Sequence, residues 1–90
     1  MSIRYKQAIQ IGHNITDNMQ VPCVMECTKR DNLRGGHRIE YYYTLDPSKM
    51  VPREWQYAHL GDWLCEDYDG RWHLLTDEEY QETIKNETNL

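Results

Sequence analysis

Alternating hydrophobic and polar positions predict three β-strands in the first half of the chain. They are residues 3–11 (IRYKQAIQI), 21–28 (VPCVMECT) and 37–45 (HRIEYYYTL), all rich in residue types that favour strands. In the third segment the alternation places two sets of side chains on opposite faces. One face carries Ile39, Tyr41, Tyr43 and Leu45, and the other carries Arg38, Glu40, Tyr42 and Thr44.

The segments between these strands are polar or rich in residues that favour turns. Residues 13–20 (HNITDNMQ) have room for a short helical turn capped by Thr16 or Asp17. Residues 29–36 (KRDNLRGG) predict a flexible basic connector, because paired glycines accept positive φ angles and Asn and Asp favour turns. Residues 46–59 hold two prolines and show no clear period, so we expect a loop with one helical turn after the second proline.

The C-terminal third predicts a hairpin followed by a helix. Residues 61–67 and 71–75 form two strand candidates, joined by an Asp-Gly turn at Tyr68-Asp69-Gly70. Thr76 and Glu79 then fit a capping box, in which each side chain bonds a free N–H group at the start of a helix. Tyr80 and Ile84 lie one turn apart further along, so the helix buries one narrow stripe.

Together these elements predict an α+β fold: a single small antiparallel sheet of four or five strands, with the C-terminal helix packed over one face or end. Ninety residues are enough for one domain with one core, so residues 1–90 are expected to form a single domain. Such a sheet has exposed edges, and the tyrosine-rich strand carries little to protect it. The sequence therefore predicts a homodimer through strand pairing or through a sheet face.

Two short stretches are similar to a group of small uncharacterised phage and prophage proteins. Ala8, Ile9 and Gln10 match the basic and aromatic strand with which those proteins open. At the other end the matching residues are Gly61, Asp62, Trp63, Gly70 and Tyr80, which fit their closing Gly-Asp-Trp or Gly-Asp-Tyr hairpin and helix. The resemblance covers about a third of the chain and implies a viral origin, with host cytoplasm as the place of action. The group brings no assigned activity.

Charge is distributed unevenly between the two halves of the chain. Residues 1–45 carry six Lys or Arg and four Asp or Glu, a balance of +2, while residues 46–90 carry four and eleven, a balance of −7. Carboxylates repel phosphate, so direct binding of nucleic acid is not expected. An acidic surface with aromatic anchors instead suits a basic groove on another protein.

The leading functional hypothesis is therefore a non-enzymatic protein that binds and inhibits a host protein, such as a nucleic-acid-handling or defence complex. The predicted contact residues combine carboxylates with aromatic rings: Trp63, Glu66, Asp67, Tyr68, Asp69, Trp72, Asp77 and Glu78. Since some of the aromatic side chains at 55, 57, 63, 68 and 72 are needed for the core, only two or three of these five are expected to be exposed.

The alternative hypothesis is a binding protein that sequesters a nucleotide or another small anion. Its predicted site is the basic glycine loop with the neighbouring tyrosines, and its residues are Lys29, Arg30, Arg34, Arg38 and Tyr42. Guanidinium groups bind phosphate through paired hydrogen bonds, and aromatic rings stack on bases. The two hypotheses place the binding surface in opposite halves of the chain.

The three cysteines carry weaker hypotheses. Cys23, Cys27 and Cys65 with a histidine could ligate zinc, and Cys65 with His73 and Asp62 could serve as nucleophile, base and acid. The favoured interpretation is that the cysteines are small buried side chains, with no metal, cofactor or catalysis. An odd number of cysteines, no signal peptide and no apolar run of 18 residues predict a cytoplasmic protein outside the membrane.

Overall fold

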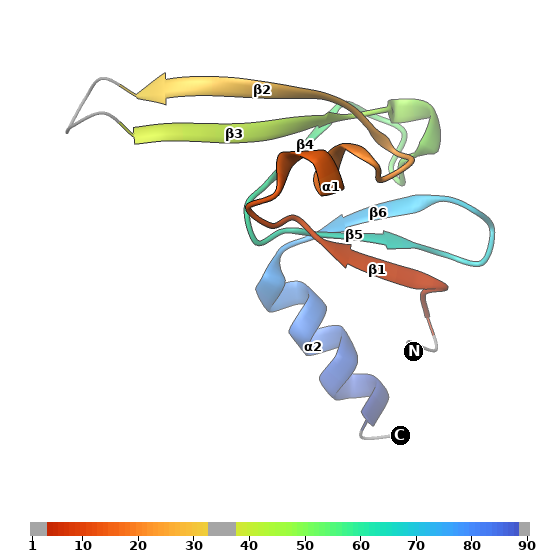
Figure 1. Cartoon of the computed structure of the whole chain (residues 1–90). Coiled ribbons are helices and arrows are strands. Elements are labelled where there is room, and N and C mark those ends of the chain that lie inside the picture. Colours follow the sequence, from red (N-terminus) through yellow and green to blue (C-terminus); the bar gives the residue numbers. More distant parts are fainter. Residues whose placement is uncertain (1–3, 33–37, 89–90) are drawn as a thin grey trace.

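The computed structural model describes residues 4–32 and 38–88, without the side chains of Asn32, Arg38 and Thr88. Its strands form two three-stranded antiparallel sheets (Figure 1). One sheet has the order β1-β5-β6, with β1 at Gln7–Gln10, β5 at Trp63–Glu66 and β6 at Trp72–Leu75. The other has the order β2-β3-β4, with β2 at Val24–Asn32, β3 at Arg38–Leu45 and β4 at Gln56–His59.

The helices are short except at the C-terminus. They are α1 (Ile15–Met19), the 3-10 helix η1 (Pro47–Lys49) and α2 (Asp77–Thr88). Figure 1 shows α1 on the side of the β2-β3-β4 sheet that faces the β1-β5-β6 sheet, and α2 on the far side of the latter. Across residues 4–32 and 38–88, no helix combines the length and the apolar character needed to cross a membrane.

The α+β class and the C-terminal helix are confirmed, but the prediction of one sheet with four or five strands is wrong. The chain leaves the β2-β3-β4 sheet after His59 and turns at Gly61, whose φ of 91° is readily adopted by glycine. Strand β5 then pairs with β1 instead of adding a fourth strand to the β2-β3-β4 sheet. Two short sheets can bury one face each against the other, which a single sheet of six short strands could not do.

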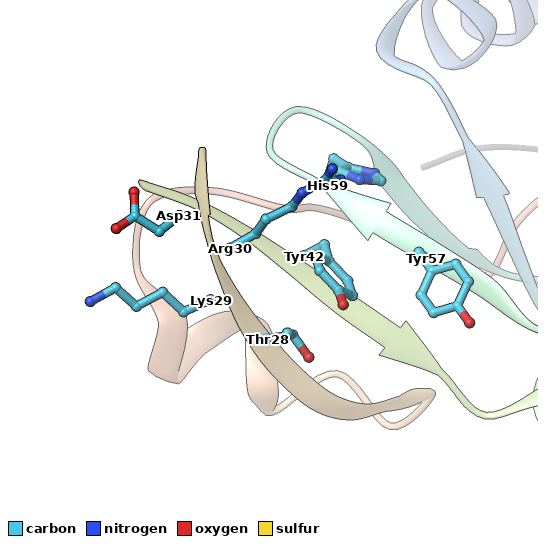
Figure 2. Close-up of a pocket in the computed structure, with 7 residues that line it drawn as sticks. All are labelled: Thr28, Lys29, Arg30, Asp31, Tyr42, Tyr57 and His59. Atoms are coloured by element: carbon cyan, nitrogen blue, oxygen red, sulfur yellow. The ribbon is translucent and has the colours of Figure 1, made fainter. Parts of the chain in front are cut away.

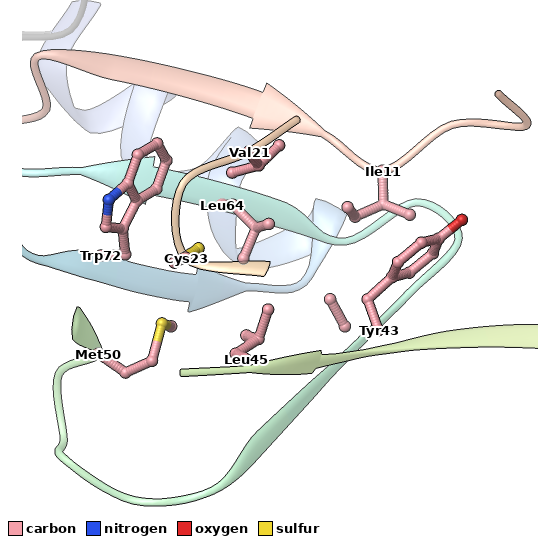
Figure 3. Close-up of a cluster of buried hydrophobic side chains, with 9 residues drawn as sticks. Ile11, Val21, Cys23, Tyr43, Leu45, Met50, Leu64 and Trp72 are labelled. Carbon is pink, nitrogen blue, oxygen red and sulfur yellow. The ribbon is translucent and has the colours of Figure 1, made fainter. Parts of the chain in front are cut away.

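The core fills the space between the two sheets (Figure 3). Because side chains alternate along a strand, Leu64 and Trp72 point from the β1-β5-β6 sheet toward Tyr43 and Leu45 of β3. The other buried members of the cluster are Ile11, Val21, Cys23, Met50 and Ala58. Strand β6 and the segment after η1 are also joined directly, since the Val51 N–H donates to the Trp72 carbonyl at 2.9 Å.

Helix α1 closes one end of this core and is capped by Asn14, not by Thr16 or Asp17 as the sequence predicted. The Asn14 side chain accepts a hydrogen bond from the Asp17 N–H at 3.2 Å. The helix buries Asn18, whose side-chain amide donates to the Gly12 carbonyl and to the Tyr43 hydroxyl, both at 2.8 Å. This amide therefore fixes the approach of α1 to β3.

The predicted hairpin and capping box are confirmed. Gly70 has a φ of 82° in the turn between β5 and β6. The Thr76 N–H donates to Glu79 Oε1 at 2.9 Å and the Glu79 N–H donates to the Thr76 hydroxyl at 3.1 Å, which is the reciprocal pair of a capping box. Helix α2 is then held against the outer face of the β1-β5-β6 sheet by Tyr80, which stacks on Trp63 with ring centroids 3.8 Å apart.

Two segments predicted as irregular are partly regular. Strand β2 continues to Asn32, so residues 29–32 of the predicted basic connector are strand, because they pair with residues 38–41 of β3. In the predicted loop, the helical turn lies at Pro47–Lys49, before Pro52, and Asp46 caps it by accepting from the Ser48 N–H. Residues 56–59 form β4, which the sequence did not predict.

Candidate functional site

The residues of the predicted acidic surface lie at two ends of the β5–β6 hairpin. Asp67, Tyr68 and Asp69 occupy the turn after Glu66, while Asp77 and Glu78 begin α2 after the opposite end of β6. The two groups are therefore separated by the length of a four-residue strand, roughly 10 Å or more. The structure brings these carboxylates together as two small groups and not as one continuous surface.

The aromatic anchors of this surface are only partly accessible. Trp72 is 2% exposed and belongs to the core, so its assignment as a contact residue is wrong. Its position in β6 places it on the face that packs against the other sheet. Trp63 is half-buried by Tyr80, which leaves Tyr68, 62% exposed, as the accessible ring of the set. Trp55 and Tyr57 are also exposed, so the expectation that two or three of the five would be exposed is confirmed.

Several of the carboxylates are also engaged by neighbouring groups of the fold. Asp67 Oδ1 accepts from the N–H groups of Asp69 and Arg71, and its Oδ2 lies 2.8 Å from His73 Nε2. Asp77 accepts from the indole N–H of Trp63 at 2.8 Å. These bonds fix the turn and the helix start, so the acids have a structural role whatever else they contact.

The hydrogen bonds to Asp67 predict a defined dependence of stability on pH. The side chain of His73 above all, and the backbone N–H groups of Arg71 and Asp69, hold the pKa of this carboxyl below its ordinary value. Such a carboxyl stabilises the fold above its unfolded pKa of about 3.9, and the contribution is lost as the pH falls through the lower, folded pKa. We expect Asp67→Asn to be less stable than wild type at pH 7 and to lose less stability on acidification below about pH 4.

Urea unfolding between pH 2 and pH 7 measures this effect. Asp69→Asn is the matched control, because Asp69 is exposed on the same turn, and it should keep the wild-type profile. If Asp67→Asn lost stability in parallel with wild type over the whole range, the pair with His73 would not be the source of the effect.

The cysteine hypotheses find no assembled site. Cys65 lies opposite His73 in the strand register, as the sequence predicted, but Asp62 accepts from the His59 N–H at 2.9 Å instead of contacting His73. Burial raises the pKa of Cys65 to about 11 and that of Cys23 to about 12, so both are thiols at neutral pH. Where the structure describes the chain, no three metal-binding side chains gather.

A different group of side chains converges on the outer face of the β2-β3-β4 sheet. Thr28, Tyr42 and His59 are aligned across the three strands, and Tyr57 lies two residues before His59 on the same face. The Tyr42 ring meets the Tyr57 ring edge-on, with centroids 5.8 Å apart, and the centroid of the His59 ring is 6.2 Å from that of Tyr42. We call Thr28, Arg30, Tyr42, Tyr57 and His59 the tyrosine face.

The strand alternation decides which cations reach the tyrosine face. Figure 2 shows the Arg30 side chain extending toward His59, while Lys29 and Asp31 point away from Tyr42. No carboxylate with a described side chain lies within ion-pair distance of Arg30, so its guanidinium is available to a ligand. Of the predicted anion-binding residues, Lys29, Arg30 and Tyr42 line one cavity, with the Lys29 side chain directed away from the Tyr42 ring. The Arg38 position lies in β3 two residues before Glu40, and Arg34 is outside the described residues.

The tyrosine face borders an open cavity of about 630 Å³. Tyr57 is 47% exposed and the His59 side chain 61% exposed, so both are accessible to a ligand, whereas Tyr42 is half-buried beside them. Glu26 and Glu40 lie on the same outer face by register and are exposed. The Lys29 ammonium and the Asp31 carboxylate also line this cavity. The site therefore offers flat rings and two cations, with the Asp31 carboxylate in its lining and those of Glu26 and Glu40 on the same face.

Sequence reasoning did not assign Tyr57 and His59 to the anion-binding site, because residues 56–59 were expected to be part of a loop. The only local signal is the spacing of two between these rings, which would place them on one face if the segment were a strand. That the segment is a strand depends on its pairing with residues 42–45 of β3.

No protein-family model, no curated protein and no solved structure matches this chain. The resemblance to phage and prophage proteins, the viral origin and the homodimer accordingly stay predictions. The geometry of the site is therefore the basis for assigning a function.

Proposed function

We propose that this is a non-enzymatic binding protein that holds a nucleotide or a related small anion on the tyrosine face. The observation that carries the proposal is the convergence of Tyr42, Tyr57 and Arg30 on one cavity. Aromatic side chains stack on bases and arginine pairs with phosphate, so the face offers both halves of a nucleotide a partner. A single small ligand also fits the charge of the chain, because a net charge of −5 opposes binding of a long polyanion.

Binding of nucleoside 5′-monophosphates, measured by isothermal titration calorimetry with each of the four common bases, tests the proposal. Stacking on one ring contributes about 1–3 kcal/mol, so Tyr57→Ala should weaken binding by about 5- to 150-fold. Tyr42→Leu, which keeps apolar bulk at a half-buried position but removes the flat ring, should weaken it similarly. Tyr68→Ala is the matched control, since Tyr68 is exposed on the distant hairpin turn.

The second candidate function is binding of a basic host protein through the hairpin turn and helix start. It is favoured by Tyr68, which is 62% exposed beside Asp69, and by the exposed carboxylate of Glu78. The double variant Asp69→Lys, Glu78→Lys separates the two functions. It should leave nucleotide binding unchanged under the first proposal and abolish capture of a basic partner under the second. If none of the nucleotides binds the wild-type protein, the first proposal is wrong.

A further inference from the structure

We infer that Arg30 and His59 together form the anion seat of the tyrosine face, and that protonation of His59 completes it. This inference rests on the proposed function and adds a regulatory property to it: affinity for an anionic nucleotide rises as the pH falls. It concerns His59, which the sequence did not assign to any site, and it divides the face into a part that holds rings and a part that holds charge.

The position of His59 supports this division. Strand β4 ends at His59, so its ring lies at the edge of the tyrosine face, tilted by 33° against Tyr42. Arg30 extends toward it from β2, on the other side of β3 (Figure 2). Tyr57 and His59 both border Tyr42 from β4. A phosphate bound by the Arg30 guanidinium and the His59 imidazole would meet donors from two strands.

Within the part of the chain that the structure describes, neither ring nitrogen of His59 forms a hydrogen bond, although Asp62 lies beside Nδ1. Nδ1 lies 3.8 Å from Asp62 Oδ2, and the same carboxylate oxygen accepts from the His59 backbone N–H at 2.9 Å. For Nε2 there is no hydrogen-bond partner among the residues that the structure describes. With Asp62 beside Nδ1, the ring is oriented so that a protonated imidazole presents its second N–H outward.

Charged and titratable groups reach His59 from several elements. Asp62 lies in the turn that follows β4, and Lys29, Arg30 and Asp31 of β2 line the same cavity as His59, together with the phenols of Tyr42 and Tyr57. Glu40, Tyr41 and Tyr43 of β3 line a second cavity with His59 and His13. An anion is attracted more strongly by a charged imidazole than by a neutral one. Because imidazole changes charge between about pH 5 and pH 8, binding and protonation should be coupled in this range.

The test uses ligands whose own charge is constant. The four nucleoside 3′,5′-cyclic monophosphates carry one negative charge across this range, unlike monoesters, whose second ionisation lies near pH 6. Affinities are measured by calorimetry at pH 8.0 and pH 5.5, with the uncharged nucleosides as a parallel series. We expect cyclic nucleotides to bind about tenfold more tightly at pH 5.5, the effect of one added charged hydrogen bond, and nucleosides to bind equally at both values.

Two variants, each with a matched control, assign the pH dependence to individual side chains. His59→Gln should remove the pH dependence while nucleosides still bind, and Arg30→Gln should weaken cyclic nucleotides at both pH values. Arg71→Gln is the matched control for Arg30, because it removes the same charge from an exposed residue that does not line the tyrosine-face cavity. His13→Gln is the control for His59, since His13 is exposed and does not line the tyrosine-face cavity.

The outcomes distinguish this inference from the proposed function. If nucleosides bind but cyclic nucleotides show no pH dependence, or if His59→Gln keeps it, the anion seat is wrong and the stacking site stands. If neither series binds at either pH, the proposed function itself is wrong.

Discussion

Replacing Trp72 by alanine is expected to lower the free energy of unfolding by about 3–5 kcal/mol, the cost of truncating a large buried aromatic side chain. Trp72 is 2% exposed and lies in the contact between the two sheets, where it packs in the same cluster as Leu64 and Met50. Since small domains are stable by only about 5–15 kcal/mol, the variant should be close to the limit of folding. Urea unfolding followed by circular dichroism measures the loss.

Two further variants make the result specific. Trp72→Phe keeps a ring in the core and should cost clearly less than alanine. Trp55→Ala removes the same side chain from a position that is 59% exposed, and a change at such a site should stay within about 0.5 kcal/mol. If Trp72→Ala unfolded at the same urea concentration as wild type, Trp72 would not be a core residue, and its ring would be available to a contact surface after all.

Replacing Asn18 by alanine is expected to cost about 2–4 kcal/mol, because it leaves several polar groups without partners. The Asn18 amide donates to the Gly12 carbonyl and the Tyr43 hydroxyl, and its Oδ1 accepts from the Gly12 N–H at 3.1 Å. Each buried group left without a hydrogen bond costs about 1–3 kcal/mol. Gly12 is more open to water than Tyr43, so most of the loss should come from the hydroxyl.

A double-mutant cycle isolates that hydroxyl. Tyr43→Phe removes it from the wild-type protein and from Asn18→Ala, and thermal or urea unfolding gives the four stabilities. If the Asn18–Tyr43 bond is the main contribution, Tyr43→Phe should cost far less in the Asn18→Ala background than in wild type. Gln20→Ala is the control for helix α1, because Gln20 is exposed and its cap bonds come from the backbone. Additive losses in the cycle would contradict the role given to this bond.

Local patterns were sufficient where neighbouring residues make the decisive contacts. The Thr76–Glu79 capping box forms from residues three apart, and the turn at Gly70 is fixed by glycine at a positive φ. Alternation in β3 correctly placed Tyr43 and Leu45 on one face, and the structure shows that both are buried. The same pattern did not predict that Ile39 stays 51% exposed, because the β2–β3 ribbon extends beyond the other sheet (Figure 1).

The candidate site likewise depends in part on contacts between residues that are far apart in the sequence. Arg30 and Tyr42 could be selected from the sequence because a cation and a ring near each other suggest an anion and a base as ligands. Tyr57 and His59 could not, since they reach the site only through the pairing of β4 with β3. Trp72 was misassigned for a related reason: its neighbours in sequence are Arg71 and His73, while its neighbours in space include core residues of the opposite sheet.

The sequence by itself determined the strands of the hairpin, the start of α2, the α+β class and the uneven distribution of charge, because these depend on residues within a few positions of each other. Tertiary structure decided that the described strands form two sheets, which of the aromatic rings are buried, and that seven residues from three strands line one cavity. Strand pairing joins residues far apart in the chain, and the burial of a ring depends on what packs against it, so local sequence patterns do not specify either one.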